Sequence, residues 1–221
     1  MQITSEIFQV GGGFMTSPED AAIYLVRFGG ESALVDSGCG NADDKLIENI
    51  RKSGTDPLKI KYLLITHCHF DHTGGACELQ KRLGFEIIAH ELDAKYLESG
   101  DNGVTAASWY GACLSPFHVD RKLAGAREEI LLGGRKIEAI HIPGHSPGSV
   151  VYLTESDGRK VLFAQDVHGP LDPSFLSNRK DYMKSLELLL DIDVDILCEG
   201  HFGVYRGKNE VSEFIRQFLR P

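Results

Sequence analysis

The chain has 221 residues, 42% of them hydrophobic and 25% charged, with a formal net charge of −9. This composition predicts a globular protein with a sizeable core. The acidic balance argues against a nucleic-acid partner, because phosphate binding depends on clustered lysine and arginine. No apolar run approaches the roughly 20 residues that span a bilayer, and the first residues lack a basic segment followed by an apolar one. We therefore expect no membrane partner and a cytoplasmic location.

The cysteines are odd in number and lack paired C-x-x-C spacing. This pattern is typical of reduced thiols in a cytosolic protein, so we expect no disulfide. The residues concerned are Cys39, Cys68, Cys77, Cys113 and Cys198.

Short β-branched runs alternate with amphipathic segments in the first half of the chain. The first three strands, separated by glycines, predict an opening antiparallel meander, and Asn41 is the expected N-cap of the first helix. The predicted elements are strands at 3–10, 21–28 and 32–36, a helix at 41–52, a strand at 61–66, a helix at 75–83, a strand at 85–89 and a helix at 91–98.

The pattern repeats in outline after a polar, glycine-containing stretch at 99–118. Two β-rich halves, each finished by helices, favour two mixed sheets packed face to face with helices outside, a four-layer αββα sandwich of the α/β (α+β) class. No linker or fixed-period repeat divides the chain, so we expect one domain over 1–221. The remaining elements are strands at 129–132, 136–142, 149–154, 160–164 and 195–199 and helices at 179–190 and 208–219.

Three histidines and an aspartate follow a buried strand in "LLITHCHFDHTGG", residues 63–75. His67 and His69 are two apart on extended backbone, so their side chains project to the same side. Asp71 and His72 follow after the chain turns toward the next helix, so they aim at a second point beside the first. Neutral imidazole and carboxylate are good ligands for zinc and other divalent ions, whereas crowded imidazoles without a metal gain little. The segment predicts ligands for two metal ions.

Further ligands are expected at other strand ends downstream. His145 lies in the bent loop "HIPGHSPGSV", Asp166 ends the strand in "VLFAQDVHG", and His201 ends the strand in "DILCEGHFG". A carboxylate between two divalent ions can bridge them, which makes Asp166 the expected shared ligand. Three other histidines lack such a context and are expected to be ordinary surface or core residues: His90, His118 and His141.

Five motifs together resemble the metallo-β-lactamase superfamily of binuclear hydrolases, in the family's order and over nearly the whole chain. They are "LVDSG" at 34–38, "THCHFDHTGG" at 66–75, "PGHSPGS" at 143–149, "AQD" at 164–166 and "EGH" at 199–201. The resemblance implies the metallo-β-lactamase fold, with Asp36 supporting the metal loop. It also implies a first metal bound by His67, His69 and His145, a second bound by Asp71, His72 and His201, and Asp166 between them.

The pattern looks most like the glyoxalase II group of thioester hydrolases. The β-lactamases of the superfamily have no bridging carboxylate at the place of Asp166, and its quorum-signal lactonases have a tyrosine where Gly169 stands. The resemblance therefore implies a hydrolase that uses a metal-bridging hydroxide to cleave a small-molecule ester, thioester or lactone. Two divalent ions are expected, zinc first, with iron or manganese also compatible with these ligands. Asp71 is either a ligand only or also the acceptor of the water's proton.

Two alternatives come from other functional classes. The persulfide dioxygenases also resemble the glyoxalases, and they use one iron held by two histidines and an aspartate. A non-catalytic relative that binds a ligand in the same cleft is the other alternative. The full set of residues for a second metal favours hydrolysis.

Substrate contacts are expected from two places. Trp109, Tyr110 and Phe117 in the stretch 99–118 are candidates for an apolar pocket wall, with core packing or a homodimer contact as the alternative. His168, two residues after Asp166, is a candidate acid or substrate contact in the cleft.

Overall fold

Two six-stranded sheets form the centre of the computed structural model, which describes residues 1–219. In the first sheet β1, β2 and β3 are antiparallel, as the predicted meander requires, and β3 to β6 are parallel. The order of the strands follows the chain: β1 (Ile7–Gly11), β2 (Ile23–Phe28), β3 (Glu31–Val35), β4 (Ile60–Leu64), β5 (Glu86–His90) and β6 (Arg121–Leu123).

The second sheet is antiparallel except for the parallel pair β10 and β11. Both sheets are therefore mixed, as predicted. The strand order, from one edge to the other, is β12 (Val204–Arg206), β11 (Ile196–Cys198), β10 (Arg159–Phe163), β9 (Val150–Ser156), β8 (Arg135–His141) and β7 (Arg127–Leu132).

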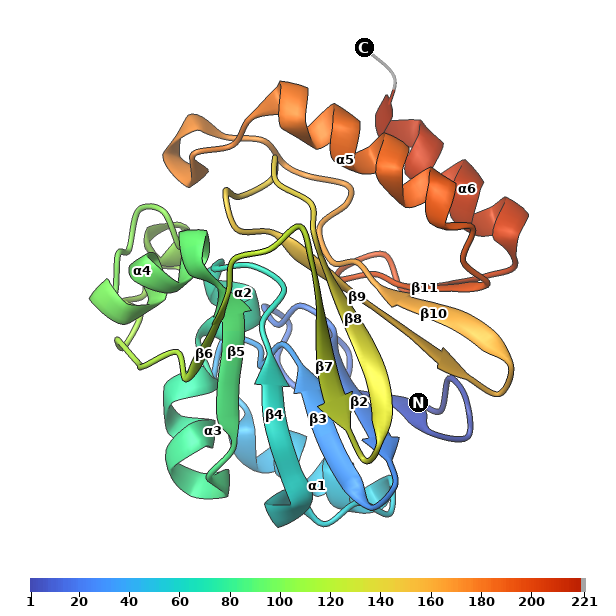
Figure 1. Ribbon diagram of the computed structural model, residues 1–221. Helices are drawn as coiled ribbons and strands as arrows, with labels where there is room; N and C mark the ends of the chain where they lie inside the picture. The colour runs from blue at the N-terminus through green and yellow to red at the C-terminus, as the bar shows by residue number, and fades with distance from the viewer. Residues whose placement is uncertain (220–221) are drawn as a thin grey trace.

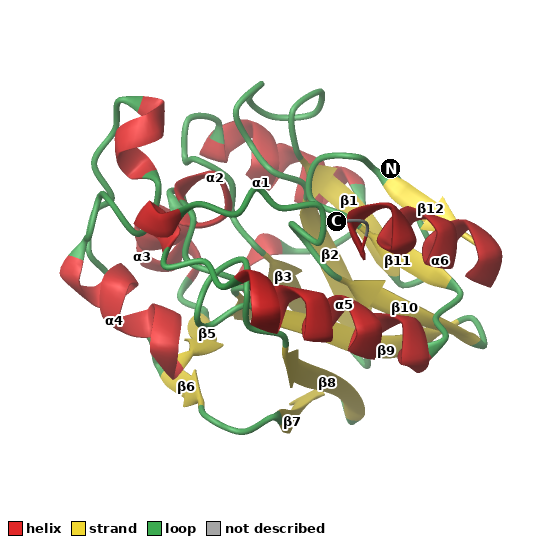
Figure 2. Ribbon diagram, turned by 90° about the horizontal axis from the view of Figure 1, so that it is seen from above, coloured by secondary structure: helices red, strands yellow, loops and turns green. Residues whose placement is uncertain are grey.

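Helices cover the outer face of each sheet (Figures 1 and 2). The first sheet carries α1 (Asp43–Lys52), α3 (Ala76–Leu83) and α4 (Glu91–Ser99), and the second carries α5 (Arg179–Ile192) and α6 (Lys208–Arg216). The predicted four-layer αββα sandwich is confirmed. Among the described residues, no helix is long and apolar enough to span a bilayer. The short helices are α2 (Phe70–Thr73) and the 3-10 turns η1 (Pro57–Lys59), η2 (Ala107–Tyr110), η3 (Pro173–Phe175) and η4 (Gln217–Leu219).

Three apolar cores separate the four layers. In β2, Ile23 and Leu25 pack toward the helices of the first sheet, whereas Tyr24, Val26 and Phe28 pack between the two sheets. This alternation follows from the two-residue period of a strand. Because both faces of the strand are buried, its sequence is an almost continuous apolar run.

The polar segments identified in the sequence lie at one end of this sandwich. Parallel strands bring their carboxyl ends to the same edge of a sheet. Asp36 follows β3, the metal loop follows β4, and Asp166 and His201 follow β10 and β11. The loop between β8 and β9 adds His145 to the same edge.

Two details differ from the sequence-based expectations. Helix α1 begins at Asp43 after Ala42, and Asn41 does not cap it, because its side-chain amide donates to Glu19 Oε2 at 3.0 Å. The short strands β6 and β12 were not predicted. Each has only three residues, which is too short for a two-residue alternation to stand out.

A stacked histidine pair joins the two sheets away from the predicted metal ligands. The rings of His90 and His141 lie 3.9 Å apart at 12°. Burial, followed by the neighbouring His141, lowers the pKa of His90 to about 4, against about 6.5 in an unfolded chain. The folded state therefore binds fewer protons between these values, and its stability decreases as pH falls through this range.

We expect the free energy of unfolding of the metal-free protein to drop between pH 6.5 and pH 4, with up to about 2 kcal/mol of the loss due to His90. In the His90→Asn variant, which keeps an acceptor for the Leu92 amide, this share of the loss should be absent. Urea denaturation of both proteins at pH 7 and pH 4.5 measures the difference. Equal pH slopes would contradict the assignment to His90.

Candidate metal centre

The metal loop, residues 65–75, leads from β4 into α2. His67 and His69 point to one side of the chain and Cys68 to the other, where its side chain is buried in the core against the helices of the first sheet. His69 is the N-cap residue of α2, and Asp71 and His72 lie within its single turn. The change from extended to helical backbone at His69 directs the two pairs of side chains to two neighbouring points.

Three imidazole nitrogens form the first cluster. His69 Nδ1 lies 3.1 Å from His67 Nε2 and 2.9 Å from His145 Nε2, and the latter two nitrogens are 3.3 Å apart. Ligand nitrogens about 2.0–2.1 Å from a tetrahedral zinc ion lie roughly 3.3 Å from one another. The spacing of the cluster therefore fits a shared metal ion.

The hydrogen bonds on the far side of the rings fix the tautomers of two of these histidines. His145 Nδ1 lies 2.8 Å from the carbonyl oxygen of Pro170, so it must donate. His67 Nδ1 donates to Thr66 Oγ1 at 3.1 Å, because that hydroxyl already donates to Asp36 at 2.6 Å. Two unprotonated Nε2 atoms consequently face each other. Such an arrangement is unfavourable unless a cation lies between them.

Asp71, His72 and His201 form the second cluster. Asp71 Oδ2 lies 3.2 Å from His201 Nε2 and 3.5 Å from His72 Nε2. The side chains of His72 and Asp71 are almost completely buried, whereas that of His201 is 33% exposed. The second cluster thus lies nearer to solvent than the first.

Asp166 lies between the two clusters. Its Oδ2 is 3.2 Å from His145 Nε2 and 3.6 Å from His67 Nε2, and its Oδ1 is 3.2 Å from His201 Nε2 and 3.3 Å from His72 Nε2. One oxygen therefore faces each cluster. Gly200 allows this approach, because a Cβ atom there would lie 2.9 Å from Asp166 Oδ1.

Several buried polar atoms of the clusters have no hydrogen-bond partner among the described residues: His69 Nε2, His72 Nε2 and Asp166 Oδ1. Unpaired buried polar atoms are costly and rare in folded proteins. Two of them belong to the groups between which a second metal ion would lie. The donor set of imidazoles and carboxylates is the one that divalent ions such as zinc bind, so these residues fit divalent metal binding.

The charges of the site are balanced within it. Burial, followed by the neighbouring imidazoles, lowers the pKa of His67 and His69 well below the usual value, so both are neutral. Burial is the largest single influence and favours the neutral form of the carboxyls. His72 and His201 together outweigh it and hold the pKa of Asp71 below the usual range, and with His145 they hold that of Asp166 well below it. Neutral imidazoles and ionised carboxylates are the forms that bind metal ions.

Asp36 holds the metal loop from behind. Its buried carboxylate accepts hydrogen bonds from the Thr66 amide at 2.8 Å, the Thr66 hydroxyl at 2.6 Å and His72 Nδ1 at 2.8 Å. The last bond orients the His72 ring so that its Nε2 faces the second cluster. Both Asp36 and Asp166 have left-handed backbone, with φ of 59° and 55°. Such strain in non-glycine residues concentrates at functional sites.

The sequence did not predict a role for two further buried carboxylates. Asp93 on α4 accepts hydrogen bonds from the Cys68 amide at 3.0 Å, the Ser146 hydroxyl at 2.6 Å and the Gly148 amide at 2.7 Å, so it joins the metal loop to the loop of His145. Glu199 similarly fixes the His201 loop. Glu199 belonged to the "EGH" motif, whereas Asp93 lies on an amphipathic helix with no pattern to mark it.

Glu199 contacts both the His201 loop and His168. Its Oε2 accepts the amides of His201 at 2.6 Å and Phe202 at 2.8 Å, and its Oε1 accepts His168 Nδ1 at 2.7 Å. This hydrogen bond turns the other ring nitrogen of His168 away from the carboxylate. His168 lines a cavity of about 200 Å³ that also contains residues of both clusters.

The aromatic residues of the 99–118 stretch divide between this cavity and the core. Trp109 and Tyr110 line the cavity together with Phe175, whose ring is 4.6 Å from that of Trp109. Phe117 is buried in the core against the helices of the first sheet, so its prediction as a pocket wall is wrong. Phe175 was missed because it comes from a separate 3-10 turn, η3, far along the chain.

Comparisons with known proteins agree with this architecture. An acyl-coenzyme A thioesterase of Gallus gallus, MBLAC2, is 29% identical over 230 aligned residues, covering 91% of this chain and 79% of that protein. The hydroxyacylglutathione hydrolase GloC of Haemophilus influenzae is 33% identical over 137 residues, covering 62% of this chain and 60% of that protein. The chain therefore spans about three fifths of the length of the latter enzyme.

The structural comparison gives the same fold. BJP-1, a subclass B3 metallo-beta-lactamase of Bradyrhizobium japonicum, superimposes with a TM-score of 0.74 and 26% identity, covering 91% of this chain and 76% of that one. The sequence model of the Metallo-beta-lactamase superfamily matches residues 16–201. The chain belongs to the metallo-beta-lactamase superfamily and is a hydrolase of that superfamily.

Proposed function

We propose that this protein is a binuclear metal-dependent hydrolase that cleaves an ester, thioester or lactone of a small molecule, acting as one domain. The observation that carries the proposal is the position of Asp166, with one carboxylate oxygen against each of the two clusters. Two relatives support the thioester class, since they are named an acyl-coenzyme A thioesterase and a hydroxyacylglutathione hydrolase.

The proposal assigns seven ligands. Three imidazoles would hold one ion, and two imidazoles and a carboxylate would hold the other. Zinc is the first candidate because these ligands suit it well. His67, His69 and His145 would hold the first ion, Asp71, His72 and His201 would hold the second, and Asp166 would be the ligand shared by both.

Divalent ions held in this way lower the pKa of water toward neutrality and polarise a carbonyl oxygen. The protein's own groups set the rest of the reaction. Asp71 Oδ2 faces His72 and His201, which leaves Oδ1 to accept the proton of the attacking water. Trp109 and Tyr110 line the cavity beside the clusters, and His168, held by Glu199, would contact the substrate there.

Metal content and activity test the proposal together. We expect protein purified without added metal to contain about two divalent ions per chain by elemental analysis. Removal with a chelator should abolish hydrolysis of acetyl and lactoyl thioesters, because the residues alone provide no activated nucleophile. Zinc should restore the activity.

Other outcomes would identify the alternatives. One iron per chain, with oxygen uptake in the presence of glutathione persulfide and no dependence on His201, would identify a dioxygenase. Ester and thioester hydrolysis that persists after complete metal removal would also contradict the proposal. Metal binding without turnover of any ester, thioester or lactone would favour a ligand-binding relative.

A further inference from the structure

Two buried tyrosines cross the core between the sheets in opposite directions. Tyr24 on β2 donates its hydroxyl to the carbonyl oxygen of Glu199, the residue after β11, at 2.6 Å. Tyr152 on β9 donates its hydroxyl to the carbonyl oxygen of Ile65, the residue after β4, at 2.8 Å. Burial raises the pKa of both phenols well above the usual range, so each keeps the proton that it donates. Each tyrosine therefore joins its own sheet to a strand end of the opposite sheet.

The two carbonyl oxygens that accept these bonds lie just beyond the hydrogen-bonded part of their strands. β4 ends at Leu64 and β11 at Cys198, and the residues that follow, Ile65 and Glu199, are buried. A buried carbonyl oxygen without a partner is costly. Among the described residues, a tyrosine hydroxyl is the partner of each of these oxygens. Phenylalanine at either tyrosine position would fill the same space in the core and leave the carbonyl oxygen unpaired.

Both bonds act close to proposed metal ligands. Ile65 precedes His67 by two residues, and Glu199 precedes His201 by two. Each cluster combines side chains of the metal loop, which follows a strand of the first sheet, with side chains from loops of the second sheet. Stacked sheets lie about 10 Å apart, a gap that each tyrosine spans with its hydrogen bond. The spacing of the sheets at this end consequently determines how far apart the ligands of each ion lie.

We infer that Tyr24 and Tyr152 are positioning residues that hold the two halves of the metal centre at the separation that the ions require. The inference rests on the proposed binuclear site and adds the groups that fix its width. The two bonds differ in what they hold. Tyr152 holds the metal loop, which contributes to both clusters, whereas Tyr24 holds the loop of His201, which contributes to the second cluster.

Tyr24→Phe and Tyr152→Phe test this difference, because each removes one hydroxyl and keeps the ring. Competition with a zinc-binding dye measures the affinity for each zinc ion, and His201→Ala identifies which ion belongs to the second cluster. In Tyr24→Phe, we expect that ion to bind about tenfold more weakly, the lower end of the effect of groups that orient ligands. Its affinity for the other ion should stay unchanged. In Tyr152→Phe, both ions should bind about tenfold more weakly.

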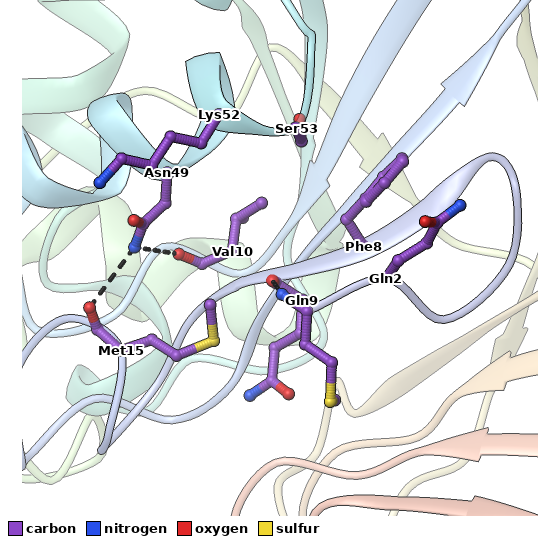
Figure 3. Close-up of a pocket in the computed structure, with 9 residues that line it drawn as sticks. Gln2, Phe8, Gln9, Val10, Met15, Asn49, Lys52 and Ser53 are labelled. Atoms are coloured by element: carbon purple, nitrogen blue, oxygen red, sulfur yellow. Dashed lines mark hydrogen bonds between the residues drawn. The ribbon is translucent and has the colours of Figure 1, made fainter.

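Two control variants remove bonds of the same kind that hold no ligand. Thr154→Val removes a buried hydroxyl that donates to the carbonyl oxygen of Lys136 at 3.0 Å. Asn49→Ala removes a side-chain amide that donates to the carbonyl oxygens of Val10 at 2.9 Å and Met15 at 3.4 Å (Figure 3). β1, which contains Val10, runs parallel to β3 and ends at the same edge of the sheet, but the loop after it carries no proposed ligand. Both controls should keep the zinc affinities of the wild type.

Urea denaturation of the metal-free proteins separates positioning from a general loss of stability. The urea midpoint should fall in Thr154→Val as it does in the tyrosine variants, but zinc affinity should fall in the tyrosine variants alone. An equal loss of zinc affinity in Thr154→Val would overturn the positioning role.

Further outcomes separate this role from the proposed function. Two zinc ions in the wild type, with unchanged affinities in both tyrosine variants, would overturn the positioning role and leave the function standing. Weakened zinc binding in both variants of a protein that hydrolyses no ester, thioester or lactone would overturn the function alone.

Discussion

Asp166→Ala should lose both bound metal and activity. Its two oxygens face different clusters, so the substitution removes a ligand from each ion. Replacing a residue that merely orients a ligand typically costs about 10–100-fold in metal affinity or activity, and loss of a shared ligand should cost more. We expect kcat/KM toward a thioester to fall by at least about a hundredfold and the metal content to fall below one ion per chain. Elemental analysis and steady-state kinetics measure the two effects.

Asp157→Ala is the matched control for this variant. Asp157 also has left-handed backbone, with φ of 51°, but it lies in the turn between β9 and β10, where it accepts the Ser5 amide. Alanine at position 157 meets the same cost of left-handed backbone as alanine at position 166, but nothing changes at the clusters. The metal content and kcat/KM of Asp157→Ala should therefore equal those of the wild type. If Asp166→Ala kept two ions and full activity, the proposal that Asp166 bridges them would be wrong.

The sandwich and the positions of the metal-facing residues followed from local patterns. His67, His69, Asp71 and His72 are close in sequence, so a single strand-to-helix turn determines how they point. His201 follows a short apolar strand, and the sequence predicts further ligands at the ends of such strands. The residues next to each metal-facing side chain in the sequence are therefore enough to predict where that side chain lies.

The contacts that hold the metal-facing residues in place depend on long-range packing. Asp93 meets Ser146 only because α4 packs beside the metal loop, a separation of 53 residues along the chain. Phe117 and Trp109 come from one aromatic stretch, yet one is buried and the other lines the cavity. Neither hydrophobicity nor spacing distinguishes them, because the difference arises from the path of an irregular loop.

Asp93→Ala should destabilise the protein and weaken metal binding together. The carboxylate accepts the amides of Cys68 and Gly148 and the hydroxyl of Ser146, and all of these groups are buried. Each buried donor left unpaired costs about 1–3 kcal/mol, so we expect a loss of about 3–5 kcal/mol in the free energy of unfolding. Metal affinity should fall about 10–100-fold, because the loops of His67 and His145 are no longer joined.

Asp101→Ala separates this positioning role from the general loss of a carboxylate that accepts two amides. Asp101 accepts the amides of Gly103 and Val104 at 3.0 Å and 2.9 Å, but it is exposed and bonds neither of the loops that Asp93 joins. Its loss should change stability by less than about 1 kcal/mol and leave metal affinity unchanged. Urea denaturation of the metal-free proteins and competition with a zinc-binding dye provide the two measurements. A stability loss in Asp93→Ala with unaltered metal affinity would mean that Asp93 supports the fold without positioning the ligands.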